Sequence, residues 1–279
     1  MPALFDTRLL SQRYARLSLA GDAAMPDFLH RHALEEIVAR LSATKRQFDR
    51  ALLCTLAPAD GALLLKGAGN VGEVVFAAPW ARPAGGGHEC VIDPRAPAFA
   101  ERRFDLAVLL MEPAFIDGLP DALLAWRRLL RPGGLFLSAF PGGETLRELR
   151  AAWAHADMRE EGAPSLRVAP FCDVRQAGSL LQLAGFVMPV TDVERLTLRY
   201  DDALSLMQEL KALGWSNMLM ERPRRPVSRR RLARAAAALE AACTEADGRL
   251  AVTLDLLYLS GWAAETQADL PAQGGACAL

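Results

Sequence analysis

The chain has 279 residues, of which 52% are hydrophobic and 23% are charged. This much apolar material is enough for a large core and excludes a disordered chain, and the length favours one elaborated domain over two. The 32 lysines and arginines nearly balance the 33 aspartates and glutamates, so the composition gives no overall attraction to nucleic acid or anionic lipid.

Cysteine usage points to a reducing compartment. The five cysteines are odd in number, far apart and never spaced as C-x-x-C: Cys54, Cys90, Cys172, Cys243 and Cys277. We therefore expect neither disulfides nor a metal site, and a cytoplasmic location. Charges are spread through residues 1–20, so a secretory signal is not predicted. No apolar run is long enough to span a bilayer, which leaves peripheral contact as the only membrane association compatible with the sequence.

Strands and helices alternate through the first half of the chain. The apolar runs predict strands over 51–56, 74–77, 90–92, 104–110 and 135–140, and the helical spacing predicts helices over 26–48, 60–66 and 117–130. This alternation indicates parallel pairing and right-handed crossovers. His30 and His32 are two apart on the first helix and point in different directions, so we expect both at the surface or partly buried.

The second half has a different pattern. It predicts helices over 144–159, 173–184, 201–213 and 229–246, and strands over 186–190, 194–200 and 250–259. Asp173 fits an N-cap, and Gly185 fits a helix stop. We divide the chain into an N-terminal helical segment (1–48), an α/β domain (49–190), a C-terminal elaboration packed on it (191–264) and a flexible tail (265–279).

Residues 67–72 spell G-x-G-x-x-G, which taken alone suggests a dinucleotide-binding loop. Such a loop needs a strand before it and a helix directly after it, so that backbone N–H groups and the helix dipole meet the phosphates. Here Val74, Val75 and Phe76 follow, and Pro79 ends the run. The sequence therefore favours a turn into the second strand.

Three segments resemble class I S-adenosylmethionine (SAM) methyltransferases. Residues 104–108 read F-D-L-A-V, residues 119–120 read L-P, and residues 129–136 read L-L-R-P-G-G-L-F. The resemblance implies a Rossmann-like α/β fold with a mostly parallel central sheet flanked by helices, an N-terminal helix and a C-terminal α+β elaboration. It also implies SAM as the cofactor.

The rest of the chain narrows the resemblance. The motifs are G-G-E-T-L-R-E-L-R (142–150), R-V-A-P-F-C-D-V-R (167–175), L-L-Q-L-A-G-F (180–186), R-Y-D-D (199–202), L-G-W-S-N (213–217) and Y-L-S-G-W (258–262). This series is similar to bacterial relatives of mitochondrial complex I assembly factor 5, from about Phe5 to Trp262. The mitochondrial proteins are linked to hydroxylating an arginine of a complex I subunit, whereas many bacterial members are described as methyltransferases or biotin-pathway methyltransferases. The resemblance thus implies a protein substrate or partner, such as a complex I subunit.

The residues that align with the cofactor site depart from the superfamily pattern. The loop after the first strand is normally acidic-x-Gly-x-x-x-Gly, and its glycines let the backbone approach the methionine moiety. Here Thr55 stands at the acidic position and Ala57 at the first glycine, while Asp60 and Gly61 end the loop. The resemblance places these four residues and Asp93 near the cofactor, and the alternative for Asp93 is a turn-forming residue before Pro94.

Two further positions differ. The end of the second strand normally carries a ribose-binding carboxylate, but residues 78–79 are Ala-Pro and the next carboxylate is Glu89. After the fourth strand the family usually has His-Trp-Val-Asn, and residues 114–117 here read A-F-I-D. The imidazole that could carry a proton is therefore missing, and the sequence assigns no catalytic residue.

The resemblance assigns a set of polar residues in the second half to a substrate or partner. They are Arg147, Arg150, Arg167, Arg175, Tyr200 and Asn217. Arginine side chains can bind carboxylates bidentately. The alternative is a solvated helix face with local ion pairs. Seven arginines between residues 222 and 234 form a second basic cluster, but no aromatic residue interrupts it, so nucleic-acid binding is not predicted.

Two hypotheses remain open from the sequence. The first is an enzyme, a SAM-fold transferase or arginine hydroxylase that acts on a complex I subunit. The second is a catalytically inactive protein that keeps the fold and the partner-binding surface while its cofactor loop has changed. The preserved motifs after residue 142 and the altered loop at 55–61 favour the second, and the ancestry favours the first.

Overall fold

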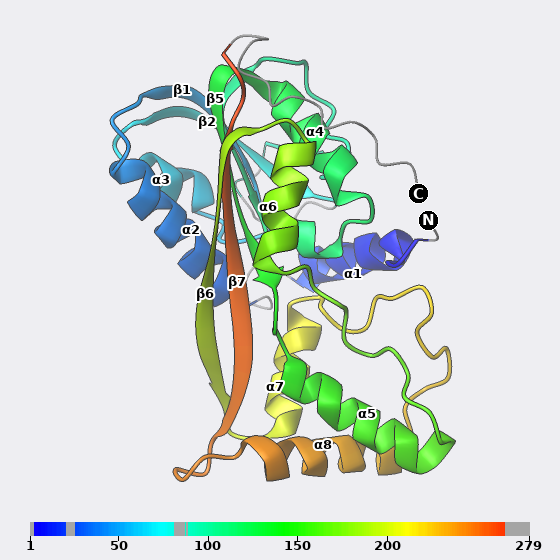
Figure 1. The fold of residues 1–279 in the computed structure, drawn as a ribbon. Coiled ribbons are helices and arrows are strands. Elements are labelled where there is room, and N and C mark those ends of the chain that lie inside the picture. Colours follow the sequence, from blue (N-terminus) through cyan, green and yellow to red (C-terminus); the bar gives the residue numbers. More distant parts are fainter. Residues whose placement is uncertain (1–2, 21–25, 81–86, 88, 266–279) are drawn as a thin grey trace.

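A seven-stranded sheet with the order β3-β2-β1-β4-β5-β7-β6 forms the centre of the protein (Figure 1). The structure is a computed structural model that describes residues 3–20, 26–80, 87 and 89–265. The strands are β1 (Phe48–Cys54), β2 (Val71–Pro79), β3 (Cys90–Ile92), β4 (Phe104–Leu110), β5 (Leu130–Gly142), β6 (Val187–Tyr200) and β7 (Leu250–Trp262). The helices are α1 (Thr7–Ala20), α2 (Phe28–Ser42), α3 (Gly61–Lys66), α4 (Leu119–Leu129), α5 (Arg147–Glu161), α6 (Val174–Leu183), α7 (Ala203–Ala212) and α8 (Arg229–Cys243).

The first five strands are parallel, and β7 runs antiparallel to both β5 and β6. Strands β1 and β4 are almost wholly buried, as expected for the middle of a parallel sheet covered by helices on both faces. The sequence predicts this alternation correctly, because its short apolar runs are separated by helices and turns. The Rossmann-like fold class is confirmed.

Each face of the sheet has its own apolar core. On one face α2 and α3 pack their leucines against side chains such as Leu53, Phe76 and Val108. On the other face α4 and α6 cover side chains such as Ala107 and Phe136, and Trp126 donates a hydrogen bond to the Pro94 carbonyl at 2.8 Å. Both clusters are continuous along the strands, so the sheet is a rigid platform for whatever lies at its edges.

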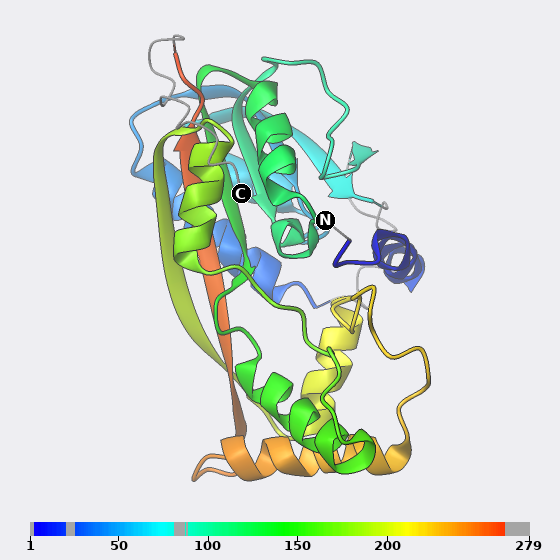
Figure 2. The ribbon, with the colours of Figure 1, turned by 45° about the vertical axis from the view of Figure 1, so that its right-hand side comes forward.

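Strands β6 and β7 extend well beyond the parallel strands and carry a second lobe, which we call the lower lobe. It consists of α5, α7, α8 and the adjoining halves of β6 and β7 (Figures 1 and 2). Its core includes Leu149, Leu206, Leu239 and Val252. The predicted domain boundary at residues 190–191 falls within β6, and the division of the chain into domains stays a prediction.

The N-terminal segment ties the two parts together. Phe5 forms an antiparallel bridge with Leu219, and the Asp6 amide donates to the Met218 carbonyl at 2.8 Å. Arg13 on α1 donates to the carbonyl oxygens of Ser216 and Asn217. These contacts hold α1 between the carboxyl ends of the parallel strands and the lower lobe (Figure 2).

Several predicted boundaries were wrong. The helix predicted over 26–48 ends at Ser42, because Phe48 already begins β1. The two strands predicted over 186–190 and 194–200 form one strand, β6, with an irregular register between Val187 and Val190. His30 is fully buried, not at the surface or partly buried, because it lies on the face of α2 that packs on the sheet.

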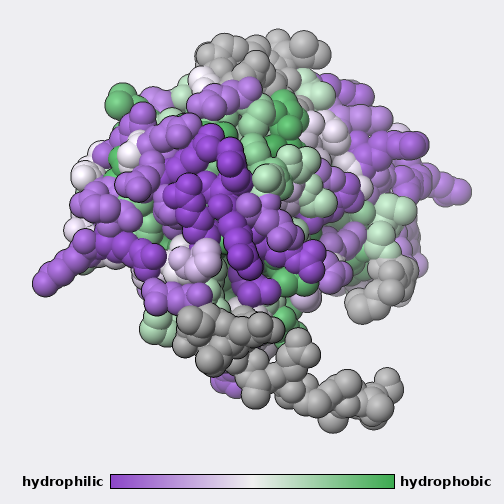
Figure 3. Space-filling view, turned by 90° about the horizontal axis from the view of Figure 1, so that it is seen from above, coloured by the Kyte–Doolittle hydropathy of each residue, from purple (hydrophilic) through white to green (hydrophobic). Residues whose placement is uncertain are grey.

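Other local predictions are confirmed. Asp173 caps α6 and forms a capping box with Gln176, and Gly185 adopts a φ of 79° just after that helix. Residues 67–72 form a turn that leads into β2. The amino ends of the parallel strands lie at the top of Figure 1, and the described surface there is mostly hydrophilic (Figure 3).

Candidate functional site

The parallel strands bring their carboxyl ends to one edge of the sheet, which is where α/β folds bind ligands. We call this edge the carboxyl edge. Two regions lie along it. The first, above β1, β2 and β3, is where the sequence places a cofactor. The second is a cavity beyond β4 and β5, between the sheet and the lower lobe.

The four residues predicted at the cofactor loop lie after β1, and their contacts are internal. Thr55 is buried and its hydroxyl donates to the Ala57 carbonyl at 2.7 Å, while Ala57 itself is buried. The carboxylate of Asp60 forms an ion pair with the guanidinium of Arg31, with 3.0 Å between Oδ1 and Nη2. A Cβ on Gly61 would lie 3.2 Å from Leu53 and 3.3 Å from Phe76, so close packing explains this glycine without a ligand.

The ends of β2 and β3 offer little to a nucleoside. Ala78 and Pro79 are buried, and Trp80 follows them. Asp93, the fifth predicted residue, forms an ion pair with Arg95 at 2.7 Å. Burial raises the pKa of Asp93, but hydrogen bonds from Arg95 outweigh it, so the pKa lies below its usual value. The carboxylate is thus already paired with a residue of its own loop.

Helix α1 packs aromatic and aliphatic side chains against this edge. The Tyr14 ring lies 5.6 Å from the ring of Trp80, and Tyr14 is buried in one cluster with Leu10, Leu56 and Phe115. Burial raises the pKa of the Tyr14 hydroxyl well above its ordinary value, as does nearby Glu112. Among the described residues, α1 therefore packs apolar and aromatic side chains against the loop after β1 and the end of β2.

Glu112 is a polar residue at this edge that sequence analysis missed. It begins the short 3₁₀ helix η2 (Glu112–Phe115) directly after β4. Its side chain is fully buried, and neither carboxyl oxygen has a hydrogen-bond partner among the described residues. Burial raises its pKa well above the ordinary value. A glutamate directly after the most apolar strand was the one sequence signal that could have drawn attention to it.

These residues do not fit SAM as the superfamily binds it. The acidic position holds a threonine whose hydroxyl bonds within its own loop, and the ribose-binding position holds alanine and proline. A hydrogen bond to a charged partner contributes about 1.5–3 kcal/mol, so losing the ribose carboxylate alone would weaken binding by roughly ten- to hundred-fold. No step of chemistry can be assigned to SAM here.

The second region is a cavity of about 260 Å³ beyond the ends of β4 and β5. It is mostly apolar. Its walls come from η2, α5, α7 and the loops that precede α6 and α8. They include Leu149, Trp153, Met207, Trp215 and Val227. Two residues predicted to bind a partner, Arg167 and Asn217, also line this cavity, although they are 50 positions apart in the sequence.

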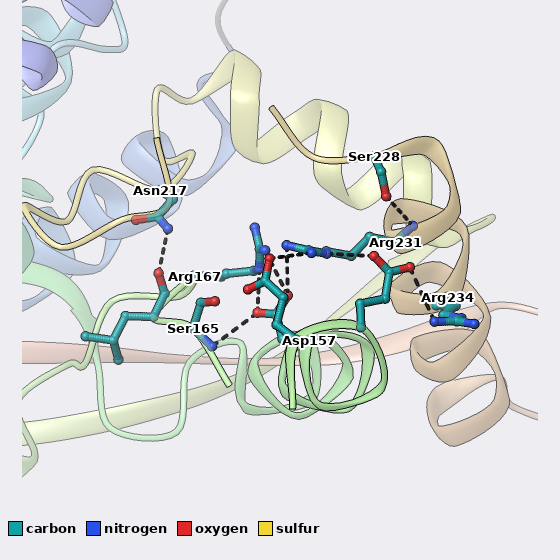
Figure 4. A network of polar contacts seen from close by, with 10 residues as sticks. Asp157, Ser165, Arg167, Asn217, Ser228, Arg231 and Arg234 are labelled. Atoms are coloured by element: carbon teal, nitrogen blue, oxygen red, sulfur yellow. Dashed lines mark hydrogen bonds and ion pairs between the residues drawn. The ribbon is translucent and has the colours of Figure 1, made fainter. Parts of the chain in front are cut away.

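Arg167 is held in the cavity wall by a buried ion cluster (Figure 4). Its guanidinium donates to Asp157 on α5 at 2.7 and 2.8 Å and lies over the Trp153 ring, 4.7 Å from the ring centre. Asp157 is fully buried, accepts from the Ser165 amide at 3.2 Å, and lies 3.6 Å from Arg231 on α8. Burial raises the pKa of Asp157, but the hydrogen bonds and charge of Arg167 outweigh burial, so this pKa lies below its usual value.

Asn217 lines the cavity with Arg167, whereas the other predicted partner residues are not among its lining residues. Arg147 is exposed and pairs with Glu148 at 3.0 Å, whereas Arg150 donates to the Ala169 carbonyl at 3.2 Å. Arg175 is exposed on α6. The Tyr200 hydroxyl donates to Glu209 at 2.9 Å. Asn217 donates to the Leu166 carbonyl at 2.7 Å, which links two walls of the cavity.

The described residues contain no group of three or more His, Cys, Asp or Glu side chains arranged to hold a metal ion. No helix in the described ranges is both long and apolar enough to cross a bilayer.

Comparison with known sequences finds two groups of relatives. The chain is 32% identical over 188 residues to the arginine-hydroxylase NDUFAF5, mitochondrial, of Danio rerio, which covers 67% of this chain and 58% of that protein. It is 38% identical over 186 residues to a malonyl-[acyl-carrier protein] O-methyltransferase of Halorhodospira halophila, which covers 66% and 60%. No protein-family model matches the chain. The alignments span about 60% of these relatives' length.

Comparison with solved structures identifies the fold. The YcgJ protein of Bacillus subtilis superposes with a TM-score of 0.55 at 13% identity, over 85% of this chain and 100% of that one. A methyltransferase candidate from Bacillus halodurans gives a TM-score of 0.51 at 9% identity, over 82% and 98%. At these identities the likeness concerns the fold alone.

Proposed function

We propose that this chain, which has the class I methyltransferase fold and is homologous to proteins named arginine-hydroxylase NDUFAF5 and malonyl-[acyl-carrier protein] O-methyltransferase, is a protein-binding assembly factor that does not use SAM. Its partner is a subunit of respiratory complex I. This is the second of the two hypotheses that the sequence leaves open.

One observation carries the proposal. The region above β1 and β2, where the superfamily seats its cofactor, is packed by Tyr14, Leu56 and Trp80. A nucleoside with a charged amino acid would have to displace the buried Tyr14 and the partly buried Trp80, and it would find no carboxylate at the ribose-binding position. Burying such polar groups without partners is unfavourable. The scaffold can stay folded without the cofactor because its two sheet-face cores do not depend on this edge.

The lower lobe supports the partner-binding half of the proposal. Its helices are joined by buried and half-buried ion pairs, and the cavity beneath β4 and β5 lies between it and the sheet. Such a preformed concave surface can bind a partner without a large ordering cost. The complex I subunit as partner comes from the resemblance to complex I assembly factor 5.

A cytoplasmic location is part of the same proposal. Cys54, Cys90, Cys172 and Cys243 form no disulfide, which is compatible with the reducing cytoplasm. A complex I subunit is reached there before or during membrane assembly, through peripheral contact with the membrane. Nucleic acid has no part in the proposed role.

Besides the enzyme names of its relatives, the enzyme hypothesis has one structural observation in its favour, the buried carboxyl of Glu112 beside the carboxyl edge. A buried carboxyl without a partner is often functional. It would need a ligand that brings a hydrogen-bond donor to it. Catalysis at a rearranged site is therefore the alternative that the experiment below must distinguish from partner binding alone.

Purified complex I subunits, presented one at a time to the immobilised full-length chain, test the proposal. We expect one subunit to bind with an affinity that is unchanged by about 1 mM SAM, since SAM has no site to occupy. Mass spectrometry of that subunit after incubation with the chain and SAM should show no added methyl group or oxygen atom.

Three results would refute the proposal. They are binding that requires SAM, a modified subunit, or no binding by any subunit. Unrelated soluble proteins of similar size and charge serve as the controls for binding.

A further inference from the structure

The arginines between residues 222 and 234 fall into two groups in the structure. Arg222 and Arg224 pair with Asp6 at 2.9 and 3.9 Å, and Arg231 and Arg234 pair with Glu160 at 3.1 and 3.3 Å. These four arginines join the segment to the N-terminus and to α5. Their role is therefore structural.

The second group has no such role. Arg225, Arg229 and Arg230 are exposed, and no ion pair is described for any of them within residues 3–265. Arg229 and Arg230 also open α8, where the helix dipole disfavours positive charge. The part of the chain that the structure describes provides no ion-pair partner for these three positive charges. Their position is explained if an anionic surface binds there.

The same segment forms part of the cavity wall. Val227, which lies between Arg225 and Arg229, lines the cavity and is 41% exposed. Leu166 and Met220 are also large, apolar and exposed, and each lies within two residues of a lining residue. Apolar side chains at the mouth of an apolar cavity, with charges around them, are typical of a protein interface.

The charge inside the cavity differs from the charge at its mouth. The guanidinium of Arg167 is paired with the carboxylate of Asp157, so the wall presents no unpaired charge of its own. The cavity therefore suits an uncharged apolar group, whereas the mouth suits negative charge. In another protein an apolar cavity of about 150 Å³ binds benzene, so about 260 Å³ has room for a large aromatic or aliphatic side chain.

We propose that the arginine surface, defined as residues 220–230 with Leu166, together with this cavity, binds an acidic polypeptide segment that inserts one large apolar side chain into the cavity. Acidic residues on either side of the anchor pair with Arg225, Arg229 and Arg230. The inference rests on the proposed function and adds the chemistry of the partner and the surface that receives it. Residues 219–230 contain no aromatic side chain on which bases could stack, which disfavours single-stranded nucleic acid.

Fluorescence anisotropy with labelled short peptides tests this surface. The probe carries aspartates on both sides of one central tryptophan, and two matched probes replace either the tryptophan with serine or the aspartates with lysines. We expect the acidic tryptophan peptide to bind at least about ten-fold more tightly than either matched probe. Its affinity should fall as salt rises, because exposed charges are screened.

Variants of the chain identify the residues. The triple variant R225E/R229E/R230E should weaken binding of the acidic peptide by about ten-fold or more. The matched control K45E/K66E/R103E makes the same change in net charge at exposed residues near the amino ends of β1, β2 and β4, and should leave binding within about two-fold. Val227→Asn, an uncharged polar change at a partly exposed position, should weaken the tryptophan peptide and not the serine peptide.

The outcomes separate this inference from the proposed function. Equal binding of the tryptophan and serine peptides, no effect of the triple variant, or tighter binding of a single-stranded oligonucleotide would each overturn the surface. If the triple variant still captures the complex I subunit normally, the surface is wrong and the proposed function stands. If the peptide results hold and no complex I subunit binds, the partner named under the proposed function is wrong and the surface stands.

Discussion

The carboxyl edge and the lower lobe differ in the polarity of the side chains that they bury. At the edge, the acidic position holds Thr55 and the ribose-binding position holds Ala78 and Pro79, and α1 packs on Leu56 and Trp80. In the lower lobe, Asp157, Arg167 and Arg231 remain polar although they are buried or nearly so. The two regions therefore differ in how their buried side chains are stabilised, by apolar packing around α1 at the edge and by paired charges in the lobe.

The comparison also shows which regions the stability of the fold depends on. The sheet-face cores hold β1 and β4 in place regardless of what lies at their ends. A polar site can therefore be replaced by apolar packing without loss of the fold. An ion cluster is different, because a single buried charge left without its partner is costly. The following predictions test this contrast.

Asp157→Ala should have the largest effect on stability. It leaves the nearly buried guanidinium of Arg167 without its main partner, and breaking a buried pair costs about 3–5 kcal/mol. Urea unfolding followed by circular dichroism measures the change. The control is Glu161→Ala, which removes a half-exposed partner of Arg231 and should cost about 0–1 kcal/mol. Equal losses in the two variants would show that the cluster is not a structural centre.

His30→Leu should make the protein more resistant to acid. Burial lowers the pKa of His30 from 6.5 to about 4. The folded state therefore keeps the imidazole neutral while the unfolded state binds a proton, and stability is lost as pH falls from 6.5 towards 4. The difference corresponds to roughly 3 kcal/mol. The free energy of unfolding, measured at pH 7 and pH 4, should fall less in the variant than in the native chain.

His32 provides the matched control for this prediction. It lies on the same helix but is about one-third exposed and contacts Glu194 at 3.0 Å. His32→Leu should retain the native loss of stability between pH 7 and pH 4. If both variants respond to acid alike, His30 is not the buried neutral group described above.

Glu112→Gln should give a smaller gain that appears at high pH. Burial raises the pKa of Glu112, so the folded state favours the protonated carboxyl. Its relative stability is lost as pH rises through the folded pKa, because the unfolded state ionises first. The amide cannot ionise, and we expect the variant to be about 1–3 kcal/mol more stable than the native chain at high pH. Thermal unfolding of the variant and of the native chain at pH 5 and at pH 9 measures this gain. A stability difference between variant and native chain that is the same at both pH values would contradict the prediction.

The sequence predicts the sheet well because its strands are short apolar runs bounded by Pro, Gly or charge. Residues 1–48 were assigned to a helical segment, but the bounds of α1 were not predicted, since no strong apolar repeat marks this helix. The cavity could not be foreseen, because its walls come from separate segments that meet only after β6 and β7 extend into the lower lobe. The role of Arg167 was equally hidden, since nothing in the spacing of residues 157 and 167 distinguishes a buried ion pair from an exposed arginine.

Isothermal calorimetry of the full-length chain with S-adenosylhomocysteine is the most direct test of the central claim, that the carboxyl edge no longer holds the cofactor. The account predicts no saturable heat, and no rise in melting temperature, at ligand concentrations up to about 1 mM. Saturable binding with a dissociation constant in the micromolar range would contradict it, because the packed side chains of Tyr14, Leu56 and Trp80 could not then be blocking the site.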